Sequence, residues 1–226
     1  MKIVFFGDSL TQGTRGISYV DKVVAAMPGH HFINEGVNGD TSLNLYRRVD
    51  EDVVARRPDG VLVMIGGNDA ISFSVPASRL YYRLVKRVPG GMVSPISFRE
   101  NLRAVLGKLV MAQVRVWVAL PPLEFRPEAV ETMRKLNAYA REVCQELNVP
   151  TLDLFAPLVP DTIPPRSLNR QSYLLLLRRA LNKPDYETQR KQGGYSYSFD
   201  GIHLTERGAQ VIADEVVQFL RTNGVV

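Results

Sequence analysis

Residues 2–13 read KIVFFGDSLTQG, so a short apolar run passes directly into a turn that has a glycine on each side of a serine. The run Ile3–Phe6 is continuously apolar, which is typical of a parallel strand covered on both faces. Open parallel sheets bind their ligands beyond the carboxyl ends of the strands. The pattern therefore predicts a buried first strand that brings Ser9 to a functional edge of the sheet.

Apolar runs alternate with helical patterns along the rest of the chain. Further strands are predicted at His31–Asn34, Gly60–Ile65, Val114–Leu120 and Pro150–Leu154. Apolar residues recur at helical spacing in Ile17–Met27, Ser42–Arg56, Phe98–Met111, Pro127–Leu147 and Thr205–Leu220. This alternation predicts an α/β fold, a three-layer sandwich with an open parallel sheet of about five strands. One domain over residues 1–226 is expected.

Two long stretches, residues 70–97 and 156–197, interrupt the alternation. They are either surface decoration packed on the core or flaps that wall the active site, since long insertions are often functional lids. The second stretch contains a cluster of apolar residues, Tyr173, Leu174, Leu175, Leu176 and Leu177. We predict that part of this leucine cluster lines an acyl pocket. The alternative is that all of its leucines pack as core.

The composition narrows the possible partners. The net charge is +5 and the pI is about 9.4, but the basic residues are spread along the chain. No Walker loop, zinc pattern or interleaved aromatic-basic motif is present, so we expect a small-molecule substrate and no nucleic acid. The single cysteine, Cys144, excludes an internal disulfide and a cysteine-based metal cluster. Its place on an apolar helical stripe predicts a core position.

The N-terminal apolar run is too short for a signal peptide and leads into the proposed catalytic turn. No apolar run approaches the roughly 20 residues of a membrane span. We therefore expect a cytoplasmic protein without stable membrane insertion, and the sequence leaves its oligomeric state open.

Three residue types needed for nucleophilic acyl transfer occur in suitable settings. Ser9 is the candidate nucleophile, His203 the candidate general base, and Asp200 its candidate orienting partner. Each has a simpler interpretation. Ser9 is alternatively a helix N-cap or part of a phosphate-binding turn, His203 an incidental loop histidine, and Asp200 a turn residue. The other histidines, His30 and His31, are expected to be structural.

Acyl transfer also needs hydrogen-bond donors aimed at an oxyanion. Gly39 follows the second predicted strand and offers a backbone N–H, and Asn68 follows the third and offers a side-chain amide. The carboxyl ends of parallel strands meet at one edge, so these turns are expected to lie near Ser9. The alternatives are that Gly39 only supplies a positive-φ turn and that Asn68 or Asp69 only caps a helix.

These residues fall into ordered blocks through which the chain resembles the GDSL esterases and lipases of the SGNH hydrolase superfamily. The blocks are Gly7-Asp8-Ser9-Leu10-Thr11-Gln12-Gly13, Asn38-Gly39-Asp40-Thr41, Gly66-Gly67-Asn68-Asp69 and Asp200-Gly201-Ile202-His203. They appear in the family's order, and the resemblance extends over nearly the whole chain. The Gly-x-Ser-x-Gly elbow of the α/β-hydrolases is missing, which disfavours that fold.

The resemblance implies a catalytic triad of Ser9, His203 and Asp200. It implies an oxyanion hole formed by the Ser9 N–H, the Gly39 N–H and the Asn68 side chain. It also implies a flavodoxin-like fold and a site that uses neither a metal nor a cofactor. The two long stretches are longer than the corresponding segments of the smallest family members. The resemblance therefore does not identify the substrate.

We therefore interpret the chain as a serine esterase or lipase-type hydrolase that cleaves carboxylic esters, such as short acyl or acetyl esters, through an acyl-enzyme on Ser9. An acyltransferase using the same acyl-enzyme is the first alternative. A non-catalytic carbohydrate- or lipid-binding module on the same fold is the second, and it predicts a broken triad.

Overall fold

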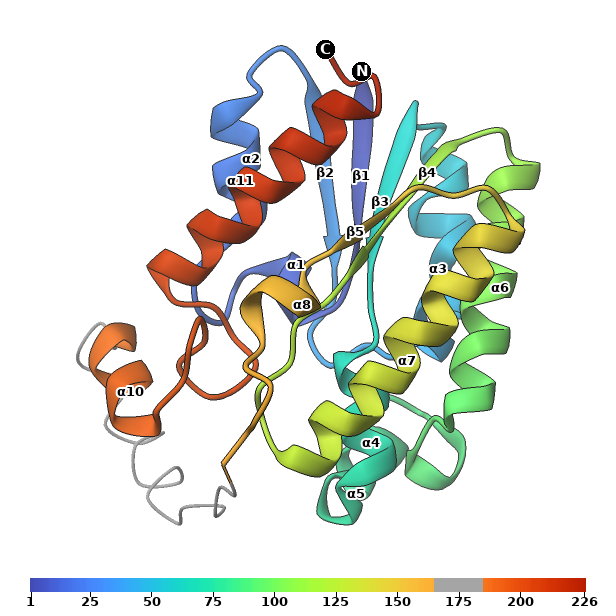
Figure 1. The fold of residues 1–226 in the computed structure, drawn as a ribbon. Coiled ribbons are helices and arrows are strands. Elements are labelled where there is room, and N and C mark those ends of the chain that lie inside the picture. Colours follow the sequence, from blue (N-terminus) through green and yellow to red (C-terminus); the bar gives the residue numbers. More distant parts are fainter. Residues whose placement is uncertain (165–184) are drawn as a thin grey trace.

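A computed structural model describes residues 1–164 and 185–226 of the chain and contains a five-stranded sheet in the order β2-β1-β3-β4-β5 (Figure 1). The strands are β1 (Lys2–Gly7), β2 (His31–Gly36), β3 (Gly60–Met64), β4 (Arg115–Leu120) and β5 (Thr151–Asp153). All neighbouring strands pair in parallel. The predicted parallel α/β sheet is confirmed, and its strand order is that of flavodoxin-like folds.

The continuous apolar runs form the middle of the sheet. In β1, Val4 pairs with Ile33 of β2 on one side and Val61 of β3 on the other. All of β3 is buried, and so is β1 after its first residue. Strands covered on both faces have no solvent side, which is why their sequences do not alternate between polar and apolar residues.

Helices cover both faces of the sheet. In Figure 1, α2 (Tyr19–Ala26) and α11 (Glu206–Thr222) lie together on one face. The other face carries α3 (Ser42–Asp52), α6 (Pro95–Met111) and α7 (Pro127–Glu146). The predicted helix Ser42–Arg56 is interrupted, since α3 ends at Asp52 and a separate 3₁₀ turn, η1 (Val54–Arg56), follows. Cys144 is buried on α7, as predicted.

The first long stretch is anchored on the core by a few buried side chains, while most of its residues are exposed or partly exposed. It contains the end of α4 (Gly67–Ser74), α5 (Arg79–Leu84) and the 3₁₀ turns η2 (Pro76–Ser78) and η3 (Pro89–Gly91). Its buried apolar side chains are Ala70, Ile71, Val75, Tyr82, Val88 and Val93. The described parts of the second stretch include most of α8 (Phe155–Leu158) and all of α10 (Tyr186–Gly193). The leucine cluster predicted to line an acyl pocket lies outside the described residues.

The carboxyl ends of the strands point toward α4, α5 and α10, whereas both chain termini lie at the opposite edge (Figure 1). The described part of the chain has no helix with the length and hydrophobicity that a membrane crossing requires.

Candidate active site

Ser9 lies where β1 turns into the short helix α1 (Ser9–Gln12). The carboxylate of Asp8 accepts a hydrogen bond from the Leu10 N–H at 3.0 Å and so caps this helix. The helix N-cap is therefore Asp8, and the interpretation of Ser9 as the cap is wrong. Gly7 allows the end of β1 to lie close to β3, because a Cβ at this position would lie 2.5 Å from the carbonyl oxygen of Met64.

The structure brings Ser9, His203 and Asp200 into one line of contacts. The Nε2 atom of His203 lies 3.1 Å from the Ser9 hydroxyl oxygen, and its Nδ1 atom lies 2.9 Å from an Asp200 carboxylate oxygen. The other Asp200 oxygen accepts the backbone N–H groups of Ile202 and His203 at 3.1 and 2.8 Å. The carboxylate is thus fixed against its own loop while it contacts the imidazole. His30 and His31 lie at the start of β2, at the opposite edge of the sheet.

Electrostatics keep Asp200 ionised beside the imidazole. Burial alone would raise the pKa of Asp200, but the hydrogen bonds and charge of His203, together with Arg15, lower it. Arg15 is half-exposed and pairs with Asp200 at 3.2 Å. An ionised carboxylate on Nδ1 favours the tautomer whose Nε2 accepts a proton. The sequence interpretation missed Arg15, although it follows the first block by two residues.

A buried carboxylate, Glu124, holds the loop that carries the histidine. Glu124 lies in the turn after β4 and accepts hydrogen bonds from the backbone N–H groups of Ser196, Tyr197 and Ser198 at 2.9–3.2 Å. It also accepts from the Ser198 hydroxyl at 2.7 Å. That hydroxyl in turn accepts the Gly201 N–H at 2.9 Å, which links Glu124 to the turn of Asp200 and His203. The local sequence around Glu124 gives no sign of this role, because its partners lie far away along the chain.

Replacing Glu124 with glutamine is expected to weaken both the fold and the activity. Glutamine keeps one acceptor oxygen but replaces the other with an NH2 group that would face a backbone donor, and it removes the charge. Hydrogen bonds to charged groups each contribute about 1.5–3 kcal/mol. We expect a loss of about 2 kcal/mol or more in the free energy of unfolding, measured with urea, and a lower kcat. Glu128→Gln, on the exposed start of α7, is the control. Wild-type stability and kcat in Glu124→Gln would show that this carboxylate does not hold the loop.

Gly39 and Asn68 lie in the turns after β2 and β3. Gly39 has a left-handed φ of 76° in a turn whose Val37 N–H donates to the Gly7 carbonyl at 3.1 Å. The Asn68 amide nitrogen donates to the Asp8 carboxylate at 3.2 Å. Both turns are therefore joined to the segment that carries Ser9. Asn68 does not cap α4, since the N-cap position is Gly66.

A second buried carboxylate ties these two turns together. Asp69 accepts the backbone N–H of Ser42 at 3.0 Å and its hydroxyl at 2.6 Å. Burial raises the pKa of Asp69 to about 6, against the opposing effect of the Ser42 hydrogen bonds. Burial likewise raises the pKa of Asp8 to about 7. Buried carboxyl groups with raised pKa values are typical of functional sites.

The raised pKa of Asp8 makes stability depend on pH. In the unfolded chain this group ionises near 3.8, whereas the folded protein holds the proton up to about pH 7. Between these values the unfolded chain releases a proton that the folded chain keeps, so rising pH favours unfolding. Asp8→Asn removes this penalty. We compare the free energy of unfolding of Asp8→Asn with that of wild type. This difference is expected to favour the variant more at about pH 8 than at about pH 5, by more than ~1 kcal/mol. Urea titrations at both values test this, with the exposed Asp21→Asn as control. An unchanged pH slope in Asp8→Asn would contradict it.

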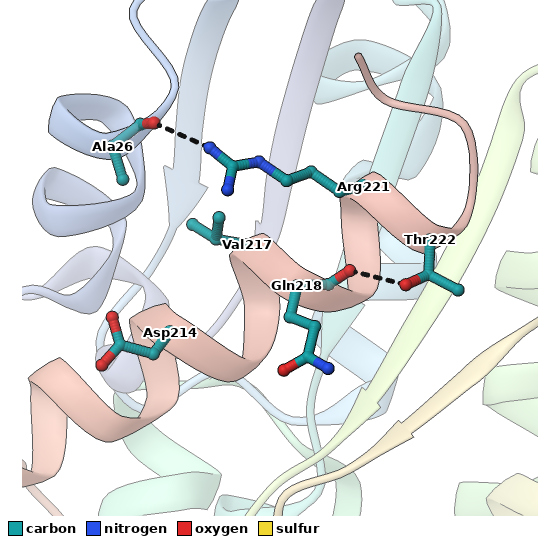
Figure 2. A pocket seen from close by; sticks show the side chains of 6 residues that line it. All are labelled: Ala26, Asp214, Val217, Gln218, Arg221 and Thr222. Atoms are coloured by element: carbon teal, nitrogen blue, oxygen red, sulfur yellow. Dashed lines mark hydrogen bonds between the residues drawn. The ribbon is translucent and has the colours of Figure 1, made fainter.

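A surface hollow lies away from these residues. It has a volume of about 420 Å³ and is lined by Ala26, Asp214, Val217, Gln218, Arg221 and Thr222 (Figure 2). Its arginine donates to the Ala26 carbonyl at 3.4 Å, and its threonine to the Gln218 carbonyl at 3.0 Å. None of the lining residues is a site residue predicted from the sequence. Among residues 1–164 and 185–226, no group of three or more His, Cys, Asp or Glu side chains is arranged to hold a metal ion.

Comparisons with known proteins place this geometry in a family. An acetylxylan esterase of Geobacillus stearothermophilus is 36% identical over 86 residues, a match that covers 30% of this chain and only 39% of that relative. Among solved structures, the acetylxylan esterase Axe2 of the same organism, in a catalytic mutant, has a TM-score of 0.67 at 20% identity. That match covers all of this chain and 94% of the other.

A lipase/acylhydrolase from Enterococcus faecalis has a TM-score of 0.65 at 23% identity, with 98% and 96% of the two chains covered. These structural similarities establish the fold. The family model of the GDSL-like lipases and acylhydrolases matches residues 5–211, which include every block described above. The chain therefore belongs to the GDSL-like lipase/acylhydrolase family, a family of hydrolases.

Proposed function

We propose that the protein is a serine esterase that hydrolyses carboxylic esters through an acyl-enzyme on Ser9. The observation that carries the proposal is the line of contacts from Asp200 through His203 to the Ser9 hydroxyl, at 2.9 and 3.1 Å. A serine hydroxyl is a weak nucleophile until a base removes its proton. Both hydrogen-bond distances are within the range that such a proton transfer requires.

In the first half of the reaction, Ser9 attacks the ester carbonyl while Nε2 of His203 takes its proton. Asp200 holds Nδ1–H and stabilises the imidazolium that forms. The imidazolium then protonates the leaving alcohol, and the acyl group stays on Ser9. In the second half, His203 takes a proton from water, the resulting hydroxide attacks the acyl-enzyme, and Ser9 leaves with the proton.

The developing oxyanion is stabilised by the backbone N–H groups of Ser9 and Gly39 and by the Asn68 amide. The placement of Ser9 at the first residue of α1 supports this role, because the positive end of a helix dipole favours negative charge. The hydrogen bond from Asn68 to Asp8 supports it too, since it places the amide beside the residue that precedes the nucleophile.

We propose short acyl or acetyl esters as substrates. The support is the matched segment of the Geobacillus relative, which is an acetylxylan esterase. An acyltransferase that uses the same acyl-enzyme is the alternative within the enzyme class. A non-catalytic binding module requires no proton relay, so it leaves the aligned serine, histidine and aspartate without a purpose.

A panel of aryl esters of increasing acyl length, together with acetylated sugars, tests the proposal. The highest kcat/KM is expected for the acetyl and shortest acyl esters. Adding an alcohol acceptor separates hydrolysis from transfer, because a transferase would give the new ester in place of the free acid. No turnover of any ester in the panel by the folded protein would contradict the proposed function.

A further inference from the structure

We propose that the segment Tyr81–Lys86, which comprises most of α5 and the two residues after it, positions the oxyanion donors. In this proposal Tyr82 holds the amide of Asn68, and Lys86 holds the loop that carries Gly39. The inference rests on the proposed function, because it assigns a role to contacts made with two of the proposed donors. The segment belongs to the first long stretch, and α5 lies beside α4 toward the carboxyl ends of the strands (Figure 1).

Tyr82 determines which way the Asn68 amide faces. The ring of Tyr82 is buried, and its hydroxyl donates to the Asn68 side-chain oxygen at 2.8 Å. On the other side of the amide, the nitrogen donates to Asp8 at 3.2 Å. Above about pH 7, where Asp8 is ionised, a flip of the amide would place its oxygen against a carboxylate that has no proton to donate. In this proposal the amide is held in one orientation, and its second N–H serves the substrate oxygen.

The protonation state of Tyr82 keeps this arrangement constant. Burial raises the pKa of Tyr82, and the nearby Asp69, Tyr81 and Asp8 raise it further. The phenol therefore stays protonated and remains a donor throughout the neutral and mildly alkaline range.

Lys86 fixes the loop on both sides of Gly39. Its ammonium group donates to the carbonyl of Asn38 at 2.8 Å and pairs with the carboxylate of Asp40 at 2.5 Å. These side chains are largely buried, at 12% exposed for Lys86 and 4% for Asp40, so solvent screens the pair weakly. Lys86 thus contacts the residues on both sides of Gly39, while Arg48 pairs with the other Asp40 oxygen at 2.8 Å. Lys86 joins Asn38 to Asp40 across the peptide that carries the Gly39 N–H.

Tyr81 completes the contact of this segment with the loop. A Cβ atom added to Gly39 would lie 2.3 Å from the Tyr81 hydroxyl oxygen, so the phenol packs directly against this glycine. The rings of Tyr81 and Tyr82 pack edge to face, with their centroids 5.2 Å apart. The two tyrosines therefore contact both proposed donors, Tyr82 through Asn68 and Tyr81 through Gly39. Donors fixed before the reaction stabilise an oxyanion most, because they need no reorganisation as charge develops.

The first test is Tyr82→Phe, which removes one hydroxyl and keeps the ring in the core. We expect kcat to fall about 10-fold with little change in KM, as for the loss of one positioning hydrogen bond. Because Tyr82 acts through Asn68, Tyr82→Phe is expected to cause no further loss in an Asn68→Ala background. Tyr46→Phe on α3 is the matched control and should keep wild-type kcat. Thermal unfolding of each variant shows whether the fold is retained.

The second test is Lys86→Met, which keeps much of the side-chain length and removes the charge. A lower kcat is expected, and this loss should add to that of Asn68→Ala, because Lys86 acts through the Gly39 loop. Lys108→Met, at a partly exposed lysine paired with Asp50 on the surface, is the matched control. If Lys86→Met fails to fold, the Tyr82 comparison decides the proposal alone.

Two results would overturn the inference: wild-type kcat in Tyr82→Phe, or a loss that adds fully to that of Asn68→Ala. If Ser9→Ala abolishes turnover while Tyr82→Phe has no effect, the positioning role is wrong and the proposed function stands. If folded Ser9→Ala keeps wild-type turnover, the proposed function is wrong and the positioning role falls with it.

Discussion

Replacing Ser9 with alanine is expected to abolish ester hydrolysis and leave the fold intact. The change removes the one oxygen that lies 3.1 Å from Nε2 of His203, so no acyl-enzyme can form. In a serine protease, loss of the nucleophile lowers kcat by about 10⁶-fold. The measurement is kcat on an aryl acetate, with thermal unfolding recorded on the same preparation.

Ser97→Ala on α6 is the control, since it removes a serine hydroxyl that bonds only near the start of that helix. It should retain wild-type turnover. If folded Ser9→Ala hydrolysed the ester at a rate close to wild type, another nucleophile would have to be sought.

Replacing Asn68 with alanine is expected to have the next largest effect. The amide is proposed to donate mainly to the transition-state oxyanion, and removal of one such donor lowers kcat by about 10²–10³-fold. KM should change little, because the donor contributes little to ground-state binding. Steady-state kinetics on the same aryl acetate separate the two constants.

Asn223→Ala, at the end of α11, is the control for the loss of an amide side chain. A large rise in KM with kcat intact in Asn68→Ala would make Asn68 a substrate-binding residue instead. The Tyr82 positioning role would then lose its link to the transition state.

The sheet could be predicted from the sequence because its central strands are buried on both faces. Val61–Met64 forms an unbroken apolar run. In a chain where such short runs alternate with amphipathic helices, each run indicates a strand that is buried between two helical layers. The edge strand β2 has a weaker pattern, with several of its residues partly exposed, and was assigned two residues too short. The sequence pattern predicts one helix over Ser42–Arg56, whereas the local backbone geometry ends α3 at Asp52.

Ser9, Gly39, Asn68 and the pair Asp200–His203 could be named from the sequence because each directly follows a strand or precedes a helix in a short motif. The structure brings the serine, histidine and aspartate together within hydrogen-bond distance. It also joins the turns of Gly39 and Asn68 to the segment that carries the serine.

The supporting residues could not be named, because their roles depend on contacts between distant segments. Glu124 acts on residues 196–198, and Arg15 pairs with Asp200. Tyr82 lies in the first long stretch, and nothing in the local sequence shows that its hydroxyl reaches Asn68. Such pairs follow from the folded topology rather than from spacing along the chain.

Labelling with a serine-directed phosphonate tests the central claim most directly, because the reagent reacts only where a base activates a serine next to an oxyanion hole. After incubation, intact mass and peptide mapping by mass spectrometry locate the adduct. We expect one phosphonate per chain, on the peptide that contains Ser9, with loss of esterase activity in parallel and no adduct in His203→Gln. A stoichiometric adduct on a different serine, or full esterase activity after complete labelling of Ser9, would contradict the account.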